Sequence, residues 1–159
     1  MNNSVTTRIA NQVDLDSILE LYISSANPSW TNFSAKTLRE GIQKLLSCST
    51  KGFQVVAEAE DQIVGIVRVS PEWSPYRKAT FWWLENVYVV PEWRRKGVYT
   101  KMHLLILEAA RKDESICGVR LHADYDNIPA RRTYEKAGMW GRMTEQFEID
   151  FVFGPEKKS

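Results

Sequence analysis

The sequence predicts a single mixed α+β domain built around one sheet. Strand-like segments alternate with segments whose apolar residues recur at helical spacing, and no repeat, linker or low-complexity tract interrupts them. The length of 159 residues is close to the commonest size of one domain. We therefore expect one domain over residues 5–155, with residues 1–4 and 156–159 disordered.

The first half of the chain predicts a strand, two helices and a hairpin. Residues 6–10 open as a strand, after which Asp14 offers an N-cap to a helix. Ser34 can cap a second helix, because it precedes a segment with apolar residues on one face. The segments 52–58 and 62–69 are rich in β-branched residues and flank an acidic turn, which is typical of an antiparallel hairpin.

The middle of the chain predicts a central strand, a helix and a further strand. Pro71 and Pro75 mark a loop, and residues 81–90 then form a long, β-prone and largely apolar run. Residues 98–111 carry apolar residues at helical spacing, and residues 118–124 follow as a short strand.

The end of the chain predicts one more helix and a closing strand. Asn127 can cap a helix in which Pro129 lies in the tolerated first turn, and Gly138 is placed to end it. Strand-like residues around 147–153 are expected to finish the sheet.

Composition excludes several classes of protein. A formal net charge of +1 gives no global attraction for nucleic acid or for an anionic membrane. No apolar run approaches the roughly 20 residues that span a bilayer, and residues 1–5 lack the features of a secretory signal. With Cys48 and Cys117 as the two thiols, we expect a reduced, cytoplasmic setting.

A basic turn before the helix at 98–111 predicts an anion site. Arg94, Arg95 and Lys96 precede Gly97, which permits close backbone approach because it has no side chain. Unpaired N–H groups at the helix start, with these cations and Lys101, could hold a diphosphate. The turn has neither the Gly-Lys-Ser/Thr of a nucleotide-triphosphate loop nor the three-glycine dinucleotide fingerprint. A basic, solvated turn is the structural alternative.

Two spaced motifs support a functional interpretation of this turn. The pattern of Gln or Arg, two residues, Gly, one residue, and Gly or Ala is met by Arg94, Gly97 and Tyr99. The pattern Asn-x-x-Ala-x-x-x-Tyr is met on the last predicted helix by Asn127, Ala130 and Tyr134. Over residues of about 81–140 the chain resembles the GCN5-related N-acetyltransferase (GNAT) superfamily. Tyr99 departs from the pattern, and its side chain can either crowd the diphosphate or point away and pack.

The resemblance implies the details of the fold and the co-substrate. It implies a mostly antiparallel, twisted central sheet of about six to seven strands flanked by about four helices, with a splayed central strand pair that holds the cofactor. It also implies acetyl-CoA as co-substrate without a metal. The implied contacts are Val87, Val89, Arg94, Arg95, Lys96, Gly97, Val98, Tyr99, Thr100, Asn127 and Arg131. For Asn127, a role as a helix N-cap is the structural alternative.

The resemblance also implies catalytic roles. Acyl transfer to an amine needs a neutral nucleophile, a donor to the carbonyl oxygen and a proton for the departing thiolate. Tyr134 would supply that proton, the backbone of Val89 would polarise the carbonyl, and Glu85 would withdraw the proton of the amine. His122 and Asp124 compete with Glu85 as base. Packing for Tyr134 and a salt bridge for Glu85 are the structural alternatives.

Other aromatic and ionisable residues are given roles by their position. His103, on the helix after the turn, is expected to face solvent. Four tryptophans fall where the family builds its acceptor cleft, although at least half of them are expected in the core: Trp30, Trp73, Trp82 and Trp83.

The sequence therefore predicts an N-acetyltransferase that moves an acetyl group from acetyl-CoA to a primary amine of a small molecule. Direct attack in a ternary complex is expected, because Cys48 and Cys117 lie outside the matched positions. A protein N-terminal or lysine acetyltransferase and a non-catalytic CoA-binding sensor remain alternatives. A nucleic-acid binder is the weakest alternative, no membrane partner is expected, and a homodimer is left open.

Overall fold

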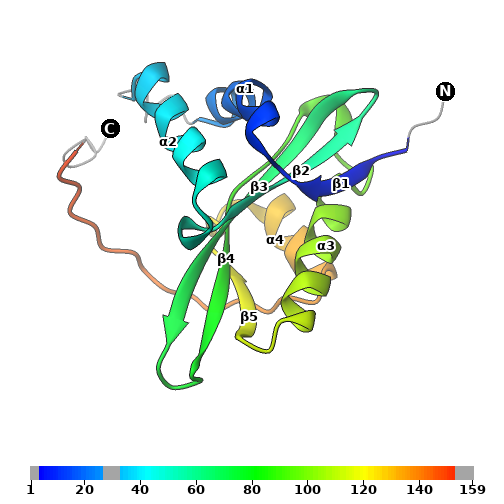
Figure 1. Cartoon of the computed structure of the whole chain (residues 1–159). Helices are drawn as coiled ribbons and strands as arrows, with labels where there is room; N and C mark the ends of the chain where they lie inside the picture. Colours follow the sequence, from blue (N-terminus) through cyan, green and yellow to red (C-terminus); the bar gives the residue numbers. More distant parts are fainter. Residues whose placement is uncertain (1–3, 27–32, 153–159) are drawn as a thin grey trace.

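The computed structural model describes residues 4–26 and 33–152 (Figure 1). The predictions made for Trp30 and for residues 1–3 and 156–159 lie outside this part of the chain. The described strands are β1 (Thr6–Ile9), β2 (Phe53–Ala59), β3 (Gln62–Ser74), β4 (Ala79–Val89) and β5 (Ile116–Leu121). The α-helices are α1 (Leu15–Ser25), α2 (Ala35–Ser47), α3 (Val98–Lys112) and α4 (Ile128–Lys136). Single turns of 3-10 helix cover Gln12–Asp14, Ser49–Lys51 and Pro91–Trp93.

The strands form one sheet in the order β1-β2-β3-β4-β5. Neighbouring strands are antiparallel except for β4 and β5, which are parallel because α3 connects them. Figure 1 shows α1 and α2 on one face of this sheet and α3 and α4 on the other. The mixed α+β class and the expected four helices are thus confirmed.

Each face of the sheet has its own core, because neighbouring strand residues point to opposite faces. On the face of α1 and α2, Ile18 and Ile42 pack with Val56 and Ile66 of the sheet. On the face of α3, the fully buried residues are contributed mainly by β2, β3 and α3, among them Val55, Val67, Val69, Met102 and Ile106.

The start of α1 differs from the predicted cap. Asp14 occupies the N-cap position but makes no side-chain cap hydrogen bond. Its carboxylate instead accepts hydrogen bonds from Arg8 of β1 and from the backbone N–H of Asn11. Ser34 caps α2 as predicted, since its hydroxyl oxygen accepts from the backbone N–H of Thr37 at 3.0 Å.

The hairpin of β3 and β4 is longer than predicted. The expected loop at Pro71 is wrong, because β3 continues to Ser74 and Pro71 lies opposite Trp82 of β4. The pairing of β2 with β3 ends at Val69, so Pro71 has one neighbouring strand and needs no ladder N–H on its other side.

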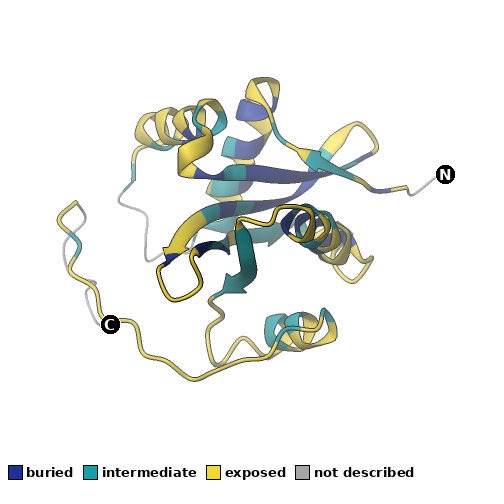
Figure 2. Ribbon diagram, turned by 60° about the horizontal axis from the view of Figure 1, so that its bottom comes forward, coloured by how far each residue is buried: buried dark blue, intermediate teal, exposed yellow. Residues whose placement is uncertain are grey.

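The number of strands is a second correction, since the described sheet has five strands and not six to seven. Residues 118–124 were expected to be a strand, and β5 covers Ile116–Leu121 instead. The strand expected around residues 147–153 does not form in the described part, which reaches residue 152. A strand needs a ladder partner, and Figures 1 and 2 show residues 140–152 running apart from the sheet as an extended, exposed tail.

Candidate active site

Half of β4 lacks a neighbour on the side of β5. The two strands pair from Thr80 to Leu84, and β5 ends at Leu121, whereas β4 continues to Val89. Within the described residues, the backbone from Glu85 to Val89 therefore presents an open ladder edge. An extended ligand with amide groups can hydrogen-bond along such an edge as an added strand does. We refer to this opening between β4 and β5 as the β4 gap.

An irregularity in β4 marks the start of the β4 gap. Asn86 has a positive φ of 49°, and the register between β3 and β4 shifts between Ile66 and Arg68. Such a bulge bends a strand and increases its local twist, so β4 diverges from β5 at this point.

The turn after β4 exposes the amino end of α3. Gly97 is the N-cap with a φ of 76°, a backbone conformation that favours glycine, and a Cβ added there would meet nothing within 4 Å. Gly97 offers no side-chain cap, so the first N–H groups of the helix, at Val98, Tyr99 and Thr100, have no capping partner. A diphosphate fits this end, because uncapped N–H groups and the positive end of the helix dipole favour an anion.

The four predicted cations divide into two groups. Arg94, Arg95 and Lys96 are exposed around the turn. Arg94 Nε donates to the carbonyl oxygen of Val89 at 2.9 Å, which ties the turn to the end of β4. Lys101 differs from the prediction, because its Nζ donates to the backbone oxygen of Val5, the residue before β1, at 2.9 Å.

Tyr99 points away from the turn and packs in the interior. Its side chain is 8% exposed, and its ring meets that of Tyr134 edge-on at 5.3 Å between centroids. Its hydroxyl lies 3.2 Å from Nδ1 of His103. Burial raises the pKa of Tyr99. The departure from the motif therefore leaves the diphosphate end uncrowded.

His103 is a correction to the sequence analysis, since it is 2% exposed and does not face solvent. Residues 99, 103, 106 and 110 fall on one face of α3, and this spacing could have predicted its burial. Burial lowers the pKa of His103, which favours the neutral imidazole. Its Nε2 is buried without a hydrogen-bond partner among the described atoms.

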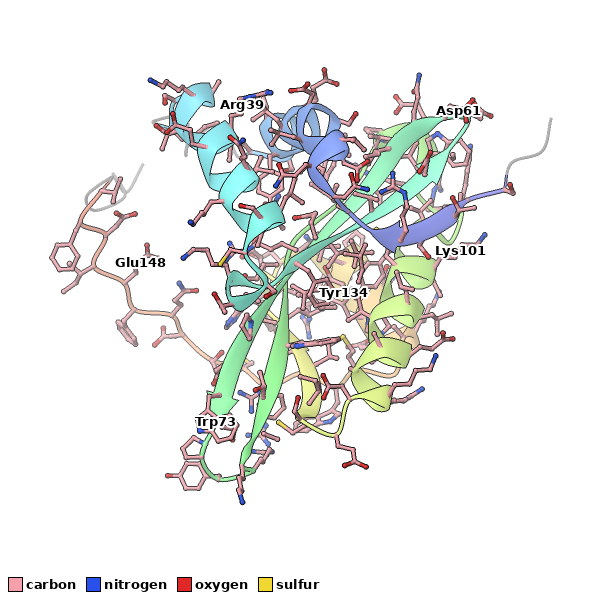
Figure 3. The ribbon with its side chains drawn as sticks, in the orientation of Figure 1. Arg39, Asp61, Trp73, Lys101, Tyr134 and Glu148 are labelled. Atoms are coloured by element: carbon pink, nitrogen blue, oxygen red, sulfur yellow. The ribbon has the colours of Figure 1, made fainter. Side chains whose placement is uncertain are left out.

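Tyr134 lies on α4 and packs against the core on the α3 face. It contacts the cluster that includes Val98, Tyr99 and Met102, and Figure 3 shows it near the centre of the molecule. Burial raises the pKa of its phenol. The hydroxyl therefore keeps its proton at neutral pH and can donate it.

Glu85 lies on the other face of β4, where its carboxylate is 43% exposed. It accepts a hydrogen bond from Ser70 Oγ at 2.7 Å, and Arg68 Nε lies 3.5 Å away. The sequence analysis missed both neighbours. They are alternate residues of β3, so the pairing register of the hairpin was the signal that could have found them.

Aromatic and charged side chains continue this face toward the β3–β4 turn. The ring of His122 stacks on Trp83 with centroids 4.5 Å apart, and Trp83 Nε1 donates to Glu72. Arg120 lies over the ring of Phe81 and 3.5 Å from Glu72. We call the surface formed by Arg68, Ser70, Glu72, Trp83, Glu85, Arg120 and His122 the acceptor face.

Two other tryptophans named in the sequence analysis, Trp82 and Trp73, and the alternative base Asp124 lie outside the acceptor face. Trp82 packs edge-on against Phe53 at 5.0 Å and belongs to the core. Trp73 is exposed near the end of β3, as Figure 3 shows. Asp124 is exposed in the loop after β5.

Asn127 and Arg131 have structural contacts at the start of α4. The side-chain oxygen of Asn127 accepts from the backbone N–H of Ala130, as the N-cap prediction requires. Arg131 Nη1 donates to the backbone oxygen of Tyr125 at 3.2 Å, and its guanidinium lies over that ring. Both residues are thus engaged in holding the loop before α4.

The described residues hold no group of three or more His, Cys, Asp or Glu residues that could bind a metal ion. None of the described helices is both long enough and apolar enough to cross a membrane.

Comparisons with known proteins agree with this architecture. A profile of the Acetyltransferase (GNAT) family matches residues 15–139. A possible acetyltransferase from Clostridium difficile 630 is 31% identical, with a TM-score of 0.80, over 93% of this chain and 98% of that one. A comparison with curated protein sequences finds no significant match.

Two further solved structures share the fold at lower identity. An aminoglycoside acetyltransferase from an uncultured soil metagenomic sample, in complex with sisomicin, has a TM-score of 0.76 at 19% identity, covering 92% of this chain and 96% of that one. An aminoglycoside N-acetyltransferase in complex with CoA has a TM-score of 0.77 at 13% identity, covering 96% and 98%. The family profile spans well over half of the chain, and the overall fold agrees with it. The chain therefore belongs to the GNAT acetyltransferase family, the family of acyl-CoA-dependent acetyl transfer.

Proposed function

We propose that the protein transfers an acetyl group from acetyl-CoA to a primary amine of a small molecule by direct attack in a ternary complex. The observation that carries this proposal is the β4 gap. The uncapped amino end of α3, which suits a diphosphate, follows the turn after β4, and Tyr134, which suits the reacting end, packs against the same core cluster as Val87 and Val89 of β4. The open backbone from Glu85 to Val89 can pair with the amide groups of pantetheine in between.

The two faces of β4 separate the two halves of the reaction. Leu84 and Tyr134 belong to the core on the α3 face, whereas Glu85 lies on the acceptor face. An amine held on the acceptor face would reach the thioester through the β4 gap. The departing sulfur would then lie on the side of Tyr134.

The proton transfers balance without a covalent enzyme intermediate. The amine nitrogen forms the new bond to the carbonyl carbon while the carbon–sulfur bond breaks. Glu85, directly or through water, takes a proton from the amine, and Tyr134 gives its proton to the sulfur. Solvent restores both groups afterwards.

The acceptor face suits a polar, cationic amine. It combines the carboxylates of Glu72 and Glu85, each with an arginine 3.5 Å away, with the aromatic surface of Trp83 and His122. Aromatic faces and carboxylates both attract ammonium groups. A protein of the same fold solved with sisomicin, an aminoglycoside, supports a small-molecule acceptor.

The central test is calorimetric titration of the purified protein with acetyl-CoA, followed by release of free thiol with a panel of amines. The panel contains aminoglycosides, polyamines, amino acids and a lysine peptide. Saturable binding and thiol release with a small amine are expected. Binding without turnover would favour the sensor alternative, and release with the peptide alone would move the acceptor to protein.

Tyr134→Phe tests the proton donor. The maximal rate should fall about 100-fold, because general acid catalysis contributes at least that factor, while the KM for acetyl-CoA stays nearly unchanged. Tyr76→Phe is the matched control, since Tyr76 is 97% exposed at the turn between β3 and β4. Wild-type kinetics in Tyr134→Phe would remove the assignment.

A further inference from the structure

A cavity of about 350 Å³ lies where the end of α2 meets the start of β2 (Figure 1). Its lining combines apolar residues, among them Leu45, Leu46 and Phe53, with the polar residue Gln54 and the thiol-bearing Cys48. A volume of this size is typical of sites that hold a small molecule. The lining residues come from β1, α2, β2 and the segments next to them, so this cavity is separate from the β4 gap.

Gln54 brings an unsatisfied hydrogen-bond donor to the cavity. Its side chain lies on the same face of β2 as that of Val56, toward α1 and α2, because the two residues are two positions apart. Its Oε1 accepts from the hydroxyl of Tyr22 at 3.1 Å. Its Nε2 is buried and has no partner among the described atoms, and the residue is 1% exposed. A buried donor without a partner is unfavourable, and a ligand oxygen would satisfy it.

Cys48 lines the same cavity and is partly exposed. Its Sγ lies 3.1 Å from Oγ1 of Thr50. The Thr50 hydroxyl lowers the pKa of the Cys48 thiol, and the N–H of Thr50 and the charge of Lys44 add to this effect. The thiolate is the nucleophilic form of a cysteine, so these surroundings favour reaction at this sulfur.

The surroundings of the thiol define the class of molecule that fits. Lys44 lies in the last turn of α2 and Lys51 in the 3-10 turn that follows, and both are exposed. Two cations favour an anionic molecule. The free N–H of Gln54 favours a carbonyl oxygen, and Leu45 and Phe53 favour methylene groups. A small peptide with carboxylates and amide carbonyls has all of these features.

We propose that Cys48 is a site of reversible modification, where it forms a mixed disulfide with a small, acidic, peptide-like thiol held in this cavity. The thiolate of Cys48 attacks one sulfur of the corresponding low-molecular-weight disulfide. The new sulfur–sulfur bond forms as the old one breaks, and the other half leaves as a thiolate. Cys48 is oxidised and the leaving half is reduced, so the disulfide is the only oxidant. This modification is independent of acetyl transfer.

The first test uses oxidised glutathione, an acidic peptide disulfide, on the reduced full chain. Intact mass is followed over time, and peptide mapping locates the addition. One glutathione should add at Cys48 at least about tenfold faster than at Cys117. Cys48→Ser should abolish the fast addition, and Cys117→Ser should keep it. No addition, or equal rates at the two cysteines, would overturn the proposal.

Gln54→Leu tests whether the cavity holds the peptide. The rate with oxidised glutathione should fall about tenfold, the effect of one hydrogen bond, while the rate with cystamine stays within about twofold. Cystamine is a small, cationic disulfide without carbonyl groups, so it reports the reactivity of the thiol alone. Gln62→Leu, at an exposed glutamine of β3, is the matched control and should change neither rate. An unchanged rate with glutathione, or an equal fall with both disulfides, would contradict binding in the cavity.

Lys51→Gln tests the charge at the surface and does not depend on a change in the interior. It should slow the reaction with oxidised glutathione but not that with cystamine, and the difference should shrink at high salt, where charge attraction is screened. The same rates as wild type at low salt would show that an acidic partner is not selected.

Discussion

At the first turn of α3, one side chain connects the cofactor end with the proposed proton donor. Tyr99 stands where the motif has Gly or Ala, and its ring supports Tyr134 from the side while its hydroxyl meets His103. The large residue is tolerated because its side chain enters the core and does not occupy the turn. The same residue therefore serves both the diphosphate end and the packing of α4.

Tyr99→Ala should lower the stability by about 3 kcal/mol, because it leaves a cavity in the core. It should also lower kcat about tenfold or more, since Tyr134 loses its lateral support, while acetyl-CoA affinity stays within about twofold. Tyr99→Phe keeps the ring and should retain most of kcat. Urea unfolding and steady-state kinetics measure these effects, and full kcat in Tyr99→Ala would show that Tyr134 is held by other contacts.

His103 predicts a pH dependence of stability. Burial, with repulsion from Arg111, lowers its pKa in the folded protein, so folding favours the neutral form. The contribution of neutral His103 to the free energy of unfolding is complete above the unfolded pKa of about 6.5 and is lost as the pH falls through the folded pKa.

The free energy of unfolding should thus decrease between pH 7 and pH 5, and His103→Asn should flatten this slope. His122→Asn, at the exposed second histidine, is the matched control for the loss of an imidazole. Urea titrations at several pH values decide this. An unchanged slope in His103→Asn would mean that the imidazole is solvated when charged.

At the scale of elements, the connection from β1 to α1 depends on a buried carboxylate. Asp14 is 5% exposed and receives two hydrogen bonds from Arg8, at 2.7 and 2.8 Å. These bonds hold the pKa of Asp14 below its usual value, with the Asn11 N–H adding to the effect. The stabilisation is present above the unfolded pKa of about 3.9 and is lost as the pH falls through the lower folded pKa.

Asp14→Asn should therefore cost about 2 kcal/mol at pH 7, and the difference from wild type should shrink below about pH 4. Asp16→Asn is the control, because Asp16 forms an exposed ion pair with Arg39 and should change stability by less than about 0.5 kcal/mol. Chemical unfolding at pH 7 and pH 3 measures both. A constant difference at the two pH values would assign the loss to something other than the carboxylate charge.

The elements also show what the sequence could and could not predict. Caps and breakers at Ser34, Asn127 and Gly138 are local signals, and the helices they bound were predicted correctly. The loop predicted at Pro71 was wrong. A proline is tolerated in β3 at this position because the pairing of β2 with β3 ends at Val69, and the sequence does not show this tertiary contact. The strand predicted around residues 147–153 was wrong for a similar reason. Alternation of apolar and polar residues shows that a segment can pair as a strand, but it does not identify the partner strand.

In the candidate site, too, local features could be predicted from the sequence and contacts between distant segments could not. The turn from Arg94 to Gly97 was predicted from local chemistry, whereas the role of Lys101 was not, because β1 lies far away in the sequence. The neighbours of Glu85 depended on the register of the hairpin, and the direction of Tyr99 depended on the packing of α4. Contacts between distant segments are the part that composition and spacing leave open.

For the molecule as a whole, acetyl-CoA should act as the missing neighbour of β4. A ligand that binds only the folded state stabilises it by about 2.7 kcal/mol at one hundred times its dissociation constant. A thermal shift that grows with acetyl-CoA concentration is therefore expected.

The cations of the turn before α3 and Lys101 within α3 are expected to separate cofactor binding from folding. Arg95→Ala with Lys96→Ala should reduce the acetyl-CoA-induced shift, and the reduction should be larger at low ionic strength, where charge attraction is least screened. Lys101→Ala removes a nearby cation of α3, but one that binds the backbone of Val5, just before β1. It should lower the melting temperature without ligand and leave the ligand-induced shift intact. If Lys101→Ala abolished the shift and the double variant did not, the diphosphate would lie toward β1 and the assignment of the turn would be wrong.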